Sequence, residues 1–148
     1  GIKEIRRSVN ELRPDALERL SLEVAIRKMV MEMSQVSEVE IYFETEEKHL
    51  KFDEDEENAI YRVIQESITN AVRHGHAKKI WITLKKIDGE ILLVIKDNGI
   101  GCEEVKSGFG TKHIKERIEM LKGTVSFDGR NGFTVTARIP IRWGETYD

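Results

Sequence analysis

The sequence predicts an α/β (α+β) two-layer sandwich in which helices cover one face of a mixed, mostly antiparallel sheet. The chain has 148 residues, which suits a single domain with its own core. Its periodic segments run helix, helix, strand, helix, strand, strand, helix, strand, strand, without the strict alternation of a doubly wound fold. Asp88-Gly89 lies between two strand-like runs and is a hairpin signal. Together these three observations favour an open sheet with one covered face.

Two helical patterns open the chain. The first ends at Pro14, because the position before a proline disfavours helix. Its apolar residues recur at helical spacing: Ile2, Ile5, Val9 and Leu12. The second begins at Asp15, and the polar run 34–37 is expected to end it. A strand is predicted over 39–43.

The strongest helical pattern runs from Asp55 to about Arg73. Asp53 is the expected N-cap, and the acidic residues after it suit the positive end of the helix dipole. Gly75 is expected to stop the helix. At about 100° per residue, its polar groups share one arc beside the apolar face. These groups are Glu66, Asn70, Arg73 and His74.

The C-terminal half alternates between short strands and turns, with one helix. Strands are predicted over 80–84, 91–95, 124–127 and 133–139. A helix around Ile114, Ile118 and Leu121 is expected to end at Gly123. Residues 142–148 are expected to form a polar tail.

Composition narrows the class of protein. The net charge of −3 lacks the basic excess of nucleic-acid-binding domains, so no nucleic acid partner is expected. The single cysteine, Cys102, cannot form an internal disulfide, which suits a reducing compartment. No apolar run approaches the roughly 20 residues of a membrane span. Because the chain opens on Gly1 instead of methionine, we expect a piece of a longer protein.

The polar arc of the long helix has the chemistry of a phosphate and metal site. The neutral amide oxygen of Asn70 suits Mg²⁺ shared with phosphates. Glu66, one turn earlier, suits ordering a metal-bound water or assisting proton transfer. Arg73 suits a phosphate, and the ring of His74 suits a ribose or base. A polar helix flank without any ligand is the alternative interpretation.

A second group of residues follows the strand at 91–95. Asp97 comes after five apolar residues, where its carboxylate suits an exocyclic amine such as that of adenine. Gly99 and Gly101 permit close backbone approach and positive φ. An ordinary Asp-Asn-Gly turn is the alternative. Gly108-Phe109-Gly110 opens the next helix, and glycines at a helix N-terminus favour anion binding.

These motifs resemble those of a known family. Gln65 to His74 fits Gln-Glu-(Ala)-x-x-Asn-Ala-x-(Arg/Lys)-His, and Asp97 to Gly101 fits Asp-(Asn/Asp)-Gly-x-Gly. The run 5–14 resembles the end of a dimerisation helix, and 132–140 matches a last strand. The chain thus resembles the ATP-binding catalytic domain of bacterial sensor histidine kinases, within the superfamily that includes gyrase, Hsp90 and MutL. The most similar subfamily is that of nitrate-sensor, degradative-enzyme and cell-envelope-stress kinases.

The resemblance implies a domain division, two cofactors and a set of site residues. Residues 1–14 would end the dimerisation-helix region, and 15–141 would form the ATP-binding catalytic domain. The implied cofactors are ATP and Mg²⁺. The catalytic residues would be Glu66 and Asn70, with Asn70 binding Mg²⁺ and Glu66 acting through water. The nucleotide-binding residues would be Asn70, Arg73, His74, Asp97, Gly99, Gly101, Gly108, Phe109, Gly110 and Thr134.

One position departs from the family pattern. After Gly110 the family has Leu-x-Gly-Met-(Arg)-Glu-Arg, whereas this chain has residues 111–117 with His113 in place of the glycine. The family's nucleotide lid would comprise Gly99, Gly101, Gly108 and Gly110. Because of this departure, the resemblance supports the lid contacts less strongly than it supports Asn70 and Asp97.

The expected function is transfer of the ATP γ-phosphate to a histidine on a dimerisation domain. The chain's histidines, at positions 49, 74, 76 and 113, lack the family's phosphoacceptor setting, so the acceptor is expected upstream. Expected partners are that phosphoacceptor domain and a response regulator, in a cytoplasmic part of a homodimeric kinase. Two alternatives are an anti-sigma-type serine kinase and a non-catalytic nucleotide-binding regulatory module.

Overall fold

The structure is a computed structural model that describes residues 14–46, 52–101 and 111–141. The helices are α2 (Asp15–Arg19), α3 (Leu22–Ser37), α4 (Glu54–Arg73) and α5 (Thr111–Met120). The strands are β1 (Glu40–Thr45), β2 (Lys79–Ile87), β3 (Glu90–Asp97), β4 (Thr124–Asp128) and β5 (Phe133–Pro140). From β1 to β5 the predicted order of elements is confirmed.

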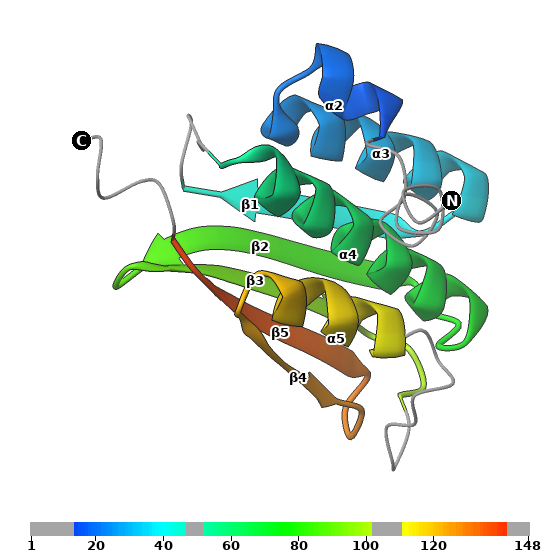
Figure 1. Cartoon of the computed structure of the whole chain (residues 1–148). Coiled ribbons are helices and arrows are strands. Elements are labelled where there is room, and N and C mark those ends of the chain that lie inside the picture. The colour runs from blue at the N-terminus through cyan, green and yellow to red at the C-terminus, as the bar shows by residue number, and fades with distance from the viewer. Residues whose placement is uncertain (1–13, 47–51, 102–110, 142–148) are drawn as a thin grey trace, which may run out of the picture.

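The five strands form one sheet in the order β1-β2-β3-β5-β4. β1 and β2 are parallel, and the other three pairs are antiparallel. Helix α3 packs on β1, α4 on β2 and β3, and α5 on β4 and β5, so the helices lie on one side of the sheet (Figure 1). The predicted two-layer sandwich is confirmed. Because β3 and β5 are neighbours, Asp97 at the end of one strand faces Phe133 at the start of the other.

The core lies between the sheet and the helices. Alternate strand residues are buried there, and α4 adds a buried row at helical spacing. The largest of these fully buried side chains include Ile60, Ile64, Ile68, Ile80, Ile82, Leu84, Ile91 and Leu93. Burial of each such side chain contributes about 1.5–3 kcal/mol. The opposite face of the sheet is open: Tyr42 and Trp81 are exposed there and stack with ring centroids 6.3 Å apart.

The helical pattern that begins at Asp15 differs from the prediction in one way. It is divided, because Leu20 is extended (φ −123°, ψ 154°) and the Ser21 hydroxyl accepts a hydrogen bond from the Val24 amide at 3.3 Å. Ser21 thereby caps a new helix. The prediction that the helix ends in the run 34–37 is confirmed. α3 continues to Ser37 and ends at Glu38, which is left-handed with φ 57°.

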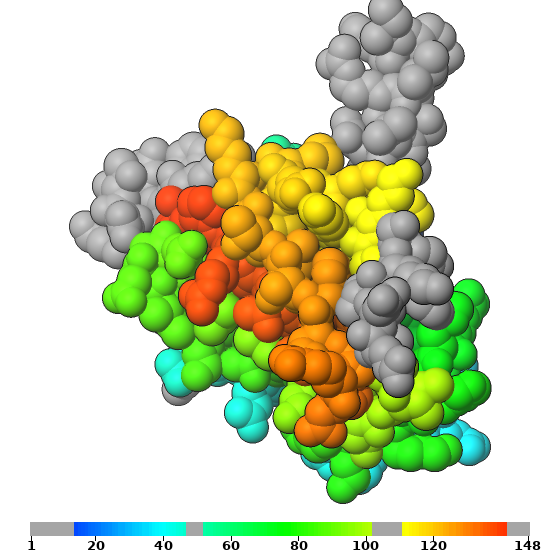
Figure 2. All heavy atoms as spheres, turned by 90° about the horizontal axis from the view of Figure 1, so that it is seen from below, coloured from blue at the N-terminus to red at the C-terminus, as the bar shows by residue number. Residues whose placement is uncertain are grey.

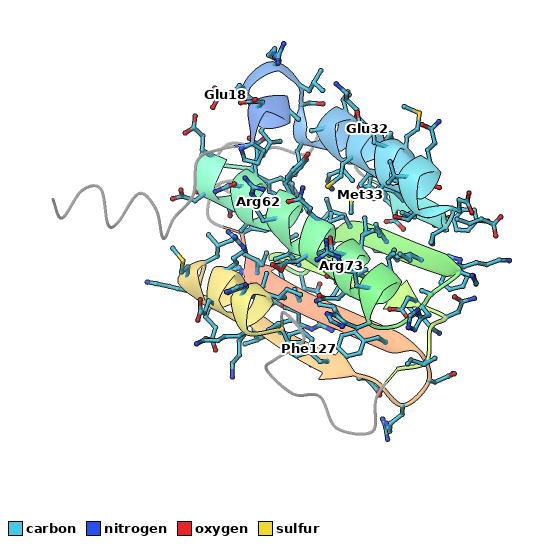
Figure 3. All side chains as sticks on the ribbon, turned by 90° about the vertical axis from the view of Figure 1, so that its right-hand side faces the viewer. Glu18, Glu32, Met33, Arg62, Arg73 and Phe127 are labelled. Atoms are coloured by element: carbon cyan, nitrogen blue, oxygen red, sulfur yellow. The ribbon has the colours of Figure 1, made fainter. Side chains whose placement is uncertain are left out.

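The long helix α4 begins at a reciprocal cap. The Asp53 carboxylate accepts a hydrogen bond from the Glu56 amide at 2.8 Å, and the Glu56 carboxylate accepts one from the Asp53 amide at 2.9 Å. Both bonds satisfy amides that a helix start leaves without partners. α4 lies between α3 and α5, with Arg73 near its C-terminal end (Figure 3).

The hairpin at Asp88-Gly89 fixes the register of the sheet. Asp88 (φ 50°) and Gly89 (φ 77°) both have positive φ, as a type I′ turn requires. The resulting register pairs Ile80 with Asp97, so Asp97 lies at the end of the sheet where β2 begins. From below, α5, β4 and β5 form much of the surface (Figure 2). None of the helices in the described ranges is long and apolar enough to cross a membrane.

We predict that Asp53→Ala lowers the free energy of unfolding by about 1 kcal/mol, because it removes the N-cap of α4. Urea denaturation followed by circular dichroism measures the change. Asp55→Ala is the matched control, since Asp55 is an exposed first-turn residue without the capping bonds. Equal stability of the two variants would contradict a stabilising role for the cap.

Candidate functional site

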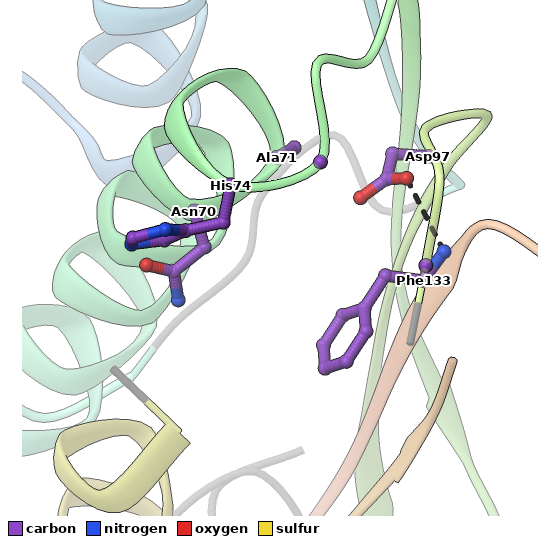
Figure 4. A pocket seen from close by; sticks show the side chains of 7 residues that line it. Asn70, Ala71, His74, Asp97 and Phe133 are labelled. Carbon is purple, nitrogen blue, oxygen red and sulfur yellow. Dashed lines mark hydrogen bonds between the residues drawn. The ribbon is translucent and has the colours of Figure 1, made fainter. Parts of the chain in front are cut away.

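A pocket opens between the C-terminal part of α4 and the sheet (Figure 4). Its lining residues are Asn70, Ala71, His74, Gly75, Asp97, Gly101 and Phe133. The structure therefore brings together residues of both predicted motifs, which lie far apart in the sequence. β2 follows α4 in the chain and β3 runs antiparallel to β2, so the end of β3 lies beside the start of β2 and near the end of α4.

Asp97 is held in a fixed orientation by the backbone. Its Oδ1 accepts hydrogen bonds from the Gly99 amide at 2.8 Å and the Phe133 amide at 3.2 Å. The other carboxylate oxygen points into the pocket (Figure 4). The side chain is 5% exposed, and this burial raises the pKa of Asp97 above its ordinary value, although the two amide bonds act in the opposite direction. A buried acceptor is thus aimed at the pocket.

Close backbone contacts explain the glycines around Asp97. A Cβ at Gly99 would lie 2.4 Å from the Gly75 carbonyl oxygen, and one at Gly132 would lie 2.1 Å from that of Asp97. Gly101 (φ 65°) and Gly132 (φ 70°) also have positive φ. The Ile100 amide donates to the Gly75 carbonyl at 2.8 Å, which ties the loop after β3 to the end of α4. Close backbone approach and positive φ were both expected from the sequence at these glycines. In the structure the close contacts are made with the protein's own backbone.

Asn98 has a structural role that the sequence analysis did not assign. Its side-chain oxygen accepts hydrogen bonds from the Lys78 and Lys79 amides at 2.9 and 2.8 Å. These bonds join the end of β3 to the start of β2. The available signal was an amide side chain directly after a buried strand, where backbone groups need partners.

The polar arc of α4 is only partly directed at the pocket. Asn70 and His74 line it, whereas Arg73 is exposed and does not. Glu66 lies one turn before Asn70, and its carboxylate is 3.6 Å from Nδ1 of His113 on α5. The residue at the position of the family's glycine therefore contacts Glu66, joining the first turn of α5 to α4.

Phe133 lines the pocket, and Thr134 does not. In β5, Val135, Ala137 and Ile139 are buried against the helices, so alternation places Phe133 on their side and Thr134 on the opposite side. The predicted strand is confirmed, and Thr134, the predicted nucleotide-binding residue, lies on the face opposite the pocket lining. The alternation of buried residues in 133–139 was the signal that distinguishes the two.

Several predicted features fall outside the described residues. These are Cys102, Gly108, Phe109, Gly110, the helical segment 1–13 and the tail 142–148. Helix α5 begins at Thr111, which is buried. Among the residues that the structure describes, no group of three or more His, Cys, Asp or Glu is arranged to hold a metal ion.

A family model matches this architecture. The model of the histidine kinase-, DNA gyrase B- and HSP90-like ATPases matches residues 55–142, more than half of the chain, from the start of α4 through β5. The chain belongs to this ATPase family. The match includes both motifs of the pocket, and the domain is of the histidine kinase type that binds ATP.

This chain is also similar to curated histidine kinases. It is 28% identical over 146 residues to the oxygen sensor histidine kinase NreB of Staphylococcus carnosus, covering 95% of this chain and 42% of that protein. It is 31% identical over 146 residues to the signal transduction histidine-protein kinase/phosphatase DegS of Brevibacillus brevis, covering 95% of this chain and 38% of that protein. The chain thus spans less than half the length of these relatives.

Solved structures show the same fold. The Acinetobacter baumannii histidine kinase AdeS aligns with a TM-score of 0.67 at 20% identity, covering 82% of this chain and 64% of that one. A nucleotide-free catalytic domain of the histidine kinase ThkA aligns with a TM-score of 0.66 at 19% identity, covering 81% of this chain and 90% of that one.

We predict that Asp97→Asn does not destabilise the ligand-free domain at pH 7 and raises its melting temperature relative to wild type. Burial raises the pKa of Asp97 despite the two amide bonds, so ionisation costs stability as pH rises through this raised pKa. Asparagine keeps the acceptor oxygen without the charge. The advantage of the variant should therefore shrink as pH falls toward 4, which thermal melts at several pH values would show.

Asp128→Asn is the control of opposite sign. The side-chain and backbone hydrogen bonds from Arg130 lower the pKa of Asp128 to about 2. Its ionised form therefore favours the folded state above pH 3.8, and the variant should lose stability at pH 7. A loss of stability at pH 7 in Asp97→Asn as well would contradict the prediction for Asp97.

Proposed function

We propose that this domain binds Mg·ATP in the α4–β3–β5 pocket and donates the γ-phosphoryl group to a histidine on a separate dimerisation and phosphoacceptor domain. The observation that carries the proposal is the buried Asp97 carboxylate, with one oxygen fixed by two amides and the other aimed at the pocket. Family membership supports ATP as the ligand.

The base end of the site fits an adenine. A carboxylate is an acceptor, and the exocyclic amine of adenine is a donor, whereas guanine presents a carbonyl at the same position. Asp97 would therefore accept a hydrogen bond from adenine and repel guanine. The glycine contacts around Gly99 and Gly132 support this role, because they hold the backbone on both sides of Asp97 in place.

The phosphate end would rest on α4. Asn70 lines the pocket and offers an uncharged oxygen, the kind of ligand that Mg²⁺ accepts when phosphates supply the remaining oxygens. Bound Mg²⁺ would neutralise phosphate charge. Glu66, one turn away, would act through water, and Arg73 at the helix end would bind phosphate. Gly108, Phe109 and Gly110, which lie outside the described residues, stay predicted lid contacts.

The acceptor would be another domain of a two-component sensor kinase. His49, His74, His76 and His113 are the chain's own histidines, and none is proposed as the phosphorylated residue. The proposed context is a homodimeric sensor kinase with a cytoplasmic catalytic part and a response regulator as the next partner. The names of the curated relatives, a sensor kinase and a kinase/phosphatase, support this placement.

We predict that Asp97→Asn weakens ATP binding by roughly 10- to 100-fold, the range expected for a hydrogen bond to a charged group. We also expect wild type to bind ATP more tightly than GTP and the variant to lose this preference. Isothermal titration calorimetry with each nucleotide measures both effects. Unchanged ATP affinity in Asp97→Asn would remove Asp97 from the base site.

We predict that Asn70→Ala keeps its fold but loses the Mg²⁺-dependent part of ATP binding and the transfer of phosphate to an added histidine domain. Circular dichroism, calorimetry with and without Mg²⁺, and transfer from radiolabelled ATP give the three readouts. Asn131→Ala, which changes an exposed asparagine in the turn before β5, is the control. Transfer to serine, or ATP binding without transfer to any added histidine domain, would contradict the histidine kinase proposal.

A further inference from the structure

Phe133 has the largest apolar side chain in the pocket, and neither sequence motif includes it. Its ring projects from the start of β5 into the space beside α4, below the free oxygen of Asp97 (Figure 4). The side chain is only partly buried. A planar ligand that donates a hydrogen bond to Asp97 would therefore lie alongside this ring.

The position of Phe133 is fixed by contacts on three sides. Its backbone amide donates to Asp97 Oδ1 at 3.2 Å. The preceding Gly132 has φ 70° and packs so closely that an added Cβ would lie 2.1 Å from the Asp97 carbonyl oxygen. The ring is also paired with that of Phe127 on β4, with centroids 6.1 Å apart and planes at 31°. A ring held in this way loses little conformational freedom when a ligand packs against it.

Aromatic rings attract other planar π-systems at short range. Paired rings prefer offset or edge-to-face arrangements with centroids about 4.5–7 Å apart. Nucleobases stack on aromatic side chains whatever the base, because every base has a π-face. Asp97 and Phe133 thus provide different kinds of recognition: a single hydrogen-bond acceptor and an aromatic surface.

We propose that Phe133 supplies binding affinity for the nucleobase in this pocket, its ring packing against the base whose amino group binds Asp97. This inference rests on the proposed function. Asp97 discriminates the amino group, and Phe133 supplies affinity for the ring system. The phosphates lie at the α4 end, so the contribution of Phe133 is independent of their number.

Calorimetric titration of ADP and ATP, together with proton NMR of the adenine H2 and H8 signals, tests this inference. Phe133→Leu keeps apolar bulk without the ring, and Phe133→Tyr keeps the ring. Tyr42→Leu is the matched control, because Tyr42 is an exposed aromatic residue of the open sheet face. Thermal melting confirms that each variant folds.

We expect Phe133→Leu to weaken ADP and ATP binding by the same factor, roughly 5- to 50-fold, within the range of aromatic–base stacking. Phe133→Tyr and Tyr42→Leu should keep wild-type affinity. The adenine signals should move upfield on binding to wild type and move less with Phe133→Leu. Equal affinity of wild type and Phe133→Leu would overturn the inference alone, and tighter binding would show that the ring occupies the space of the base. Failure of wild type to bind any nucleotide would overturn the proposed function as well.

Discussion

Two backbone amides, from Gly99 and Phe133, converge on one oxygen of Asp97, and the arrangement of the pocket depends on this contact. It joins the end of β3, the loop that follows it and the start of β5. The Ile100 amide extends the connection to Gly75 at the end of α4. The close packing around Gly99 and Gly132 leaves no room for a side chain at either position. These contacts therefore hold the sheet and helix α4 in a fixed relative position at the pocket.

Burial of Asp97 has opposite consequences for the free and the bound protein. In the free domain it disfavours the charged carboxylate, which is why the pKa is raised and stability is lost. A ligand that donates a hydrogen bond to the carboxylate oxygen facing the pocket favours the charged form, so binding compensates part of this cost. A buried ionisable group with a shifted pKa, placed where a ligand can offset the cost of its burial, is typical of functional sites. In the proposed function, phosphoryl transfer would then depend on positioning and charge neutralisation.

Much of the fold follows from local patterns. The helical repeat of 55–73, the Asp53 cap and the Asp88-Gly89 turn each specify their element, and the lack of helix–strand alternation specifies an open sheet. The sequence analysis missed features that depend on distant neighbours. The break at Leu20 rests on the capping hydroxyl of Ser21, and Asn98 is needed only because the start of β2 lies beside it. Alternation within 133–139 places Phe133 on the helix side of the sheet, but its place in the pocket depends on the pairing of β5 with β3.

The central claim is that Asp97 presents its free oxygen to a hydrogen-bond donor of the ligand. The most direct measurement is a pH titration of the Asp97 carboxyl carbon by NMR in ¹³C-labelled protein, without and with saturating ADP. The account predicts a raised pKa in the free domain and a clear decrease when ADP binds, since a donor to the carboxylate stabilises its charged form. A pKa that ADP leaves unchanged would show that the base does not contact Asp97 and would contradict the account.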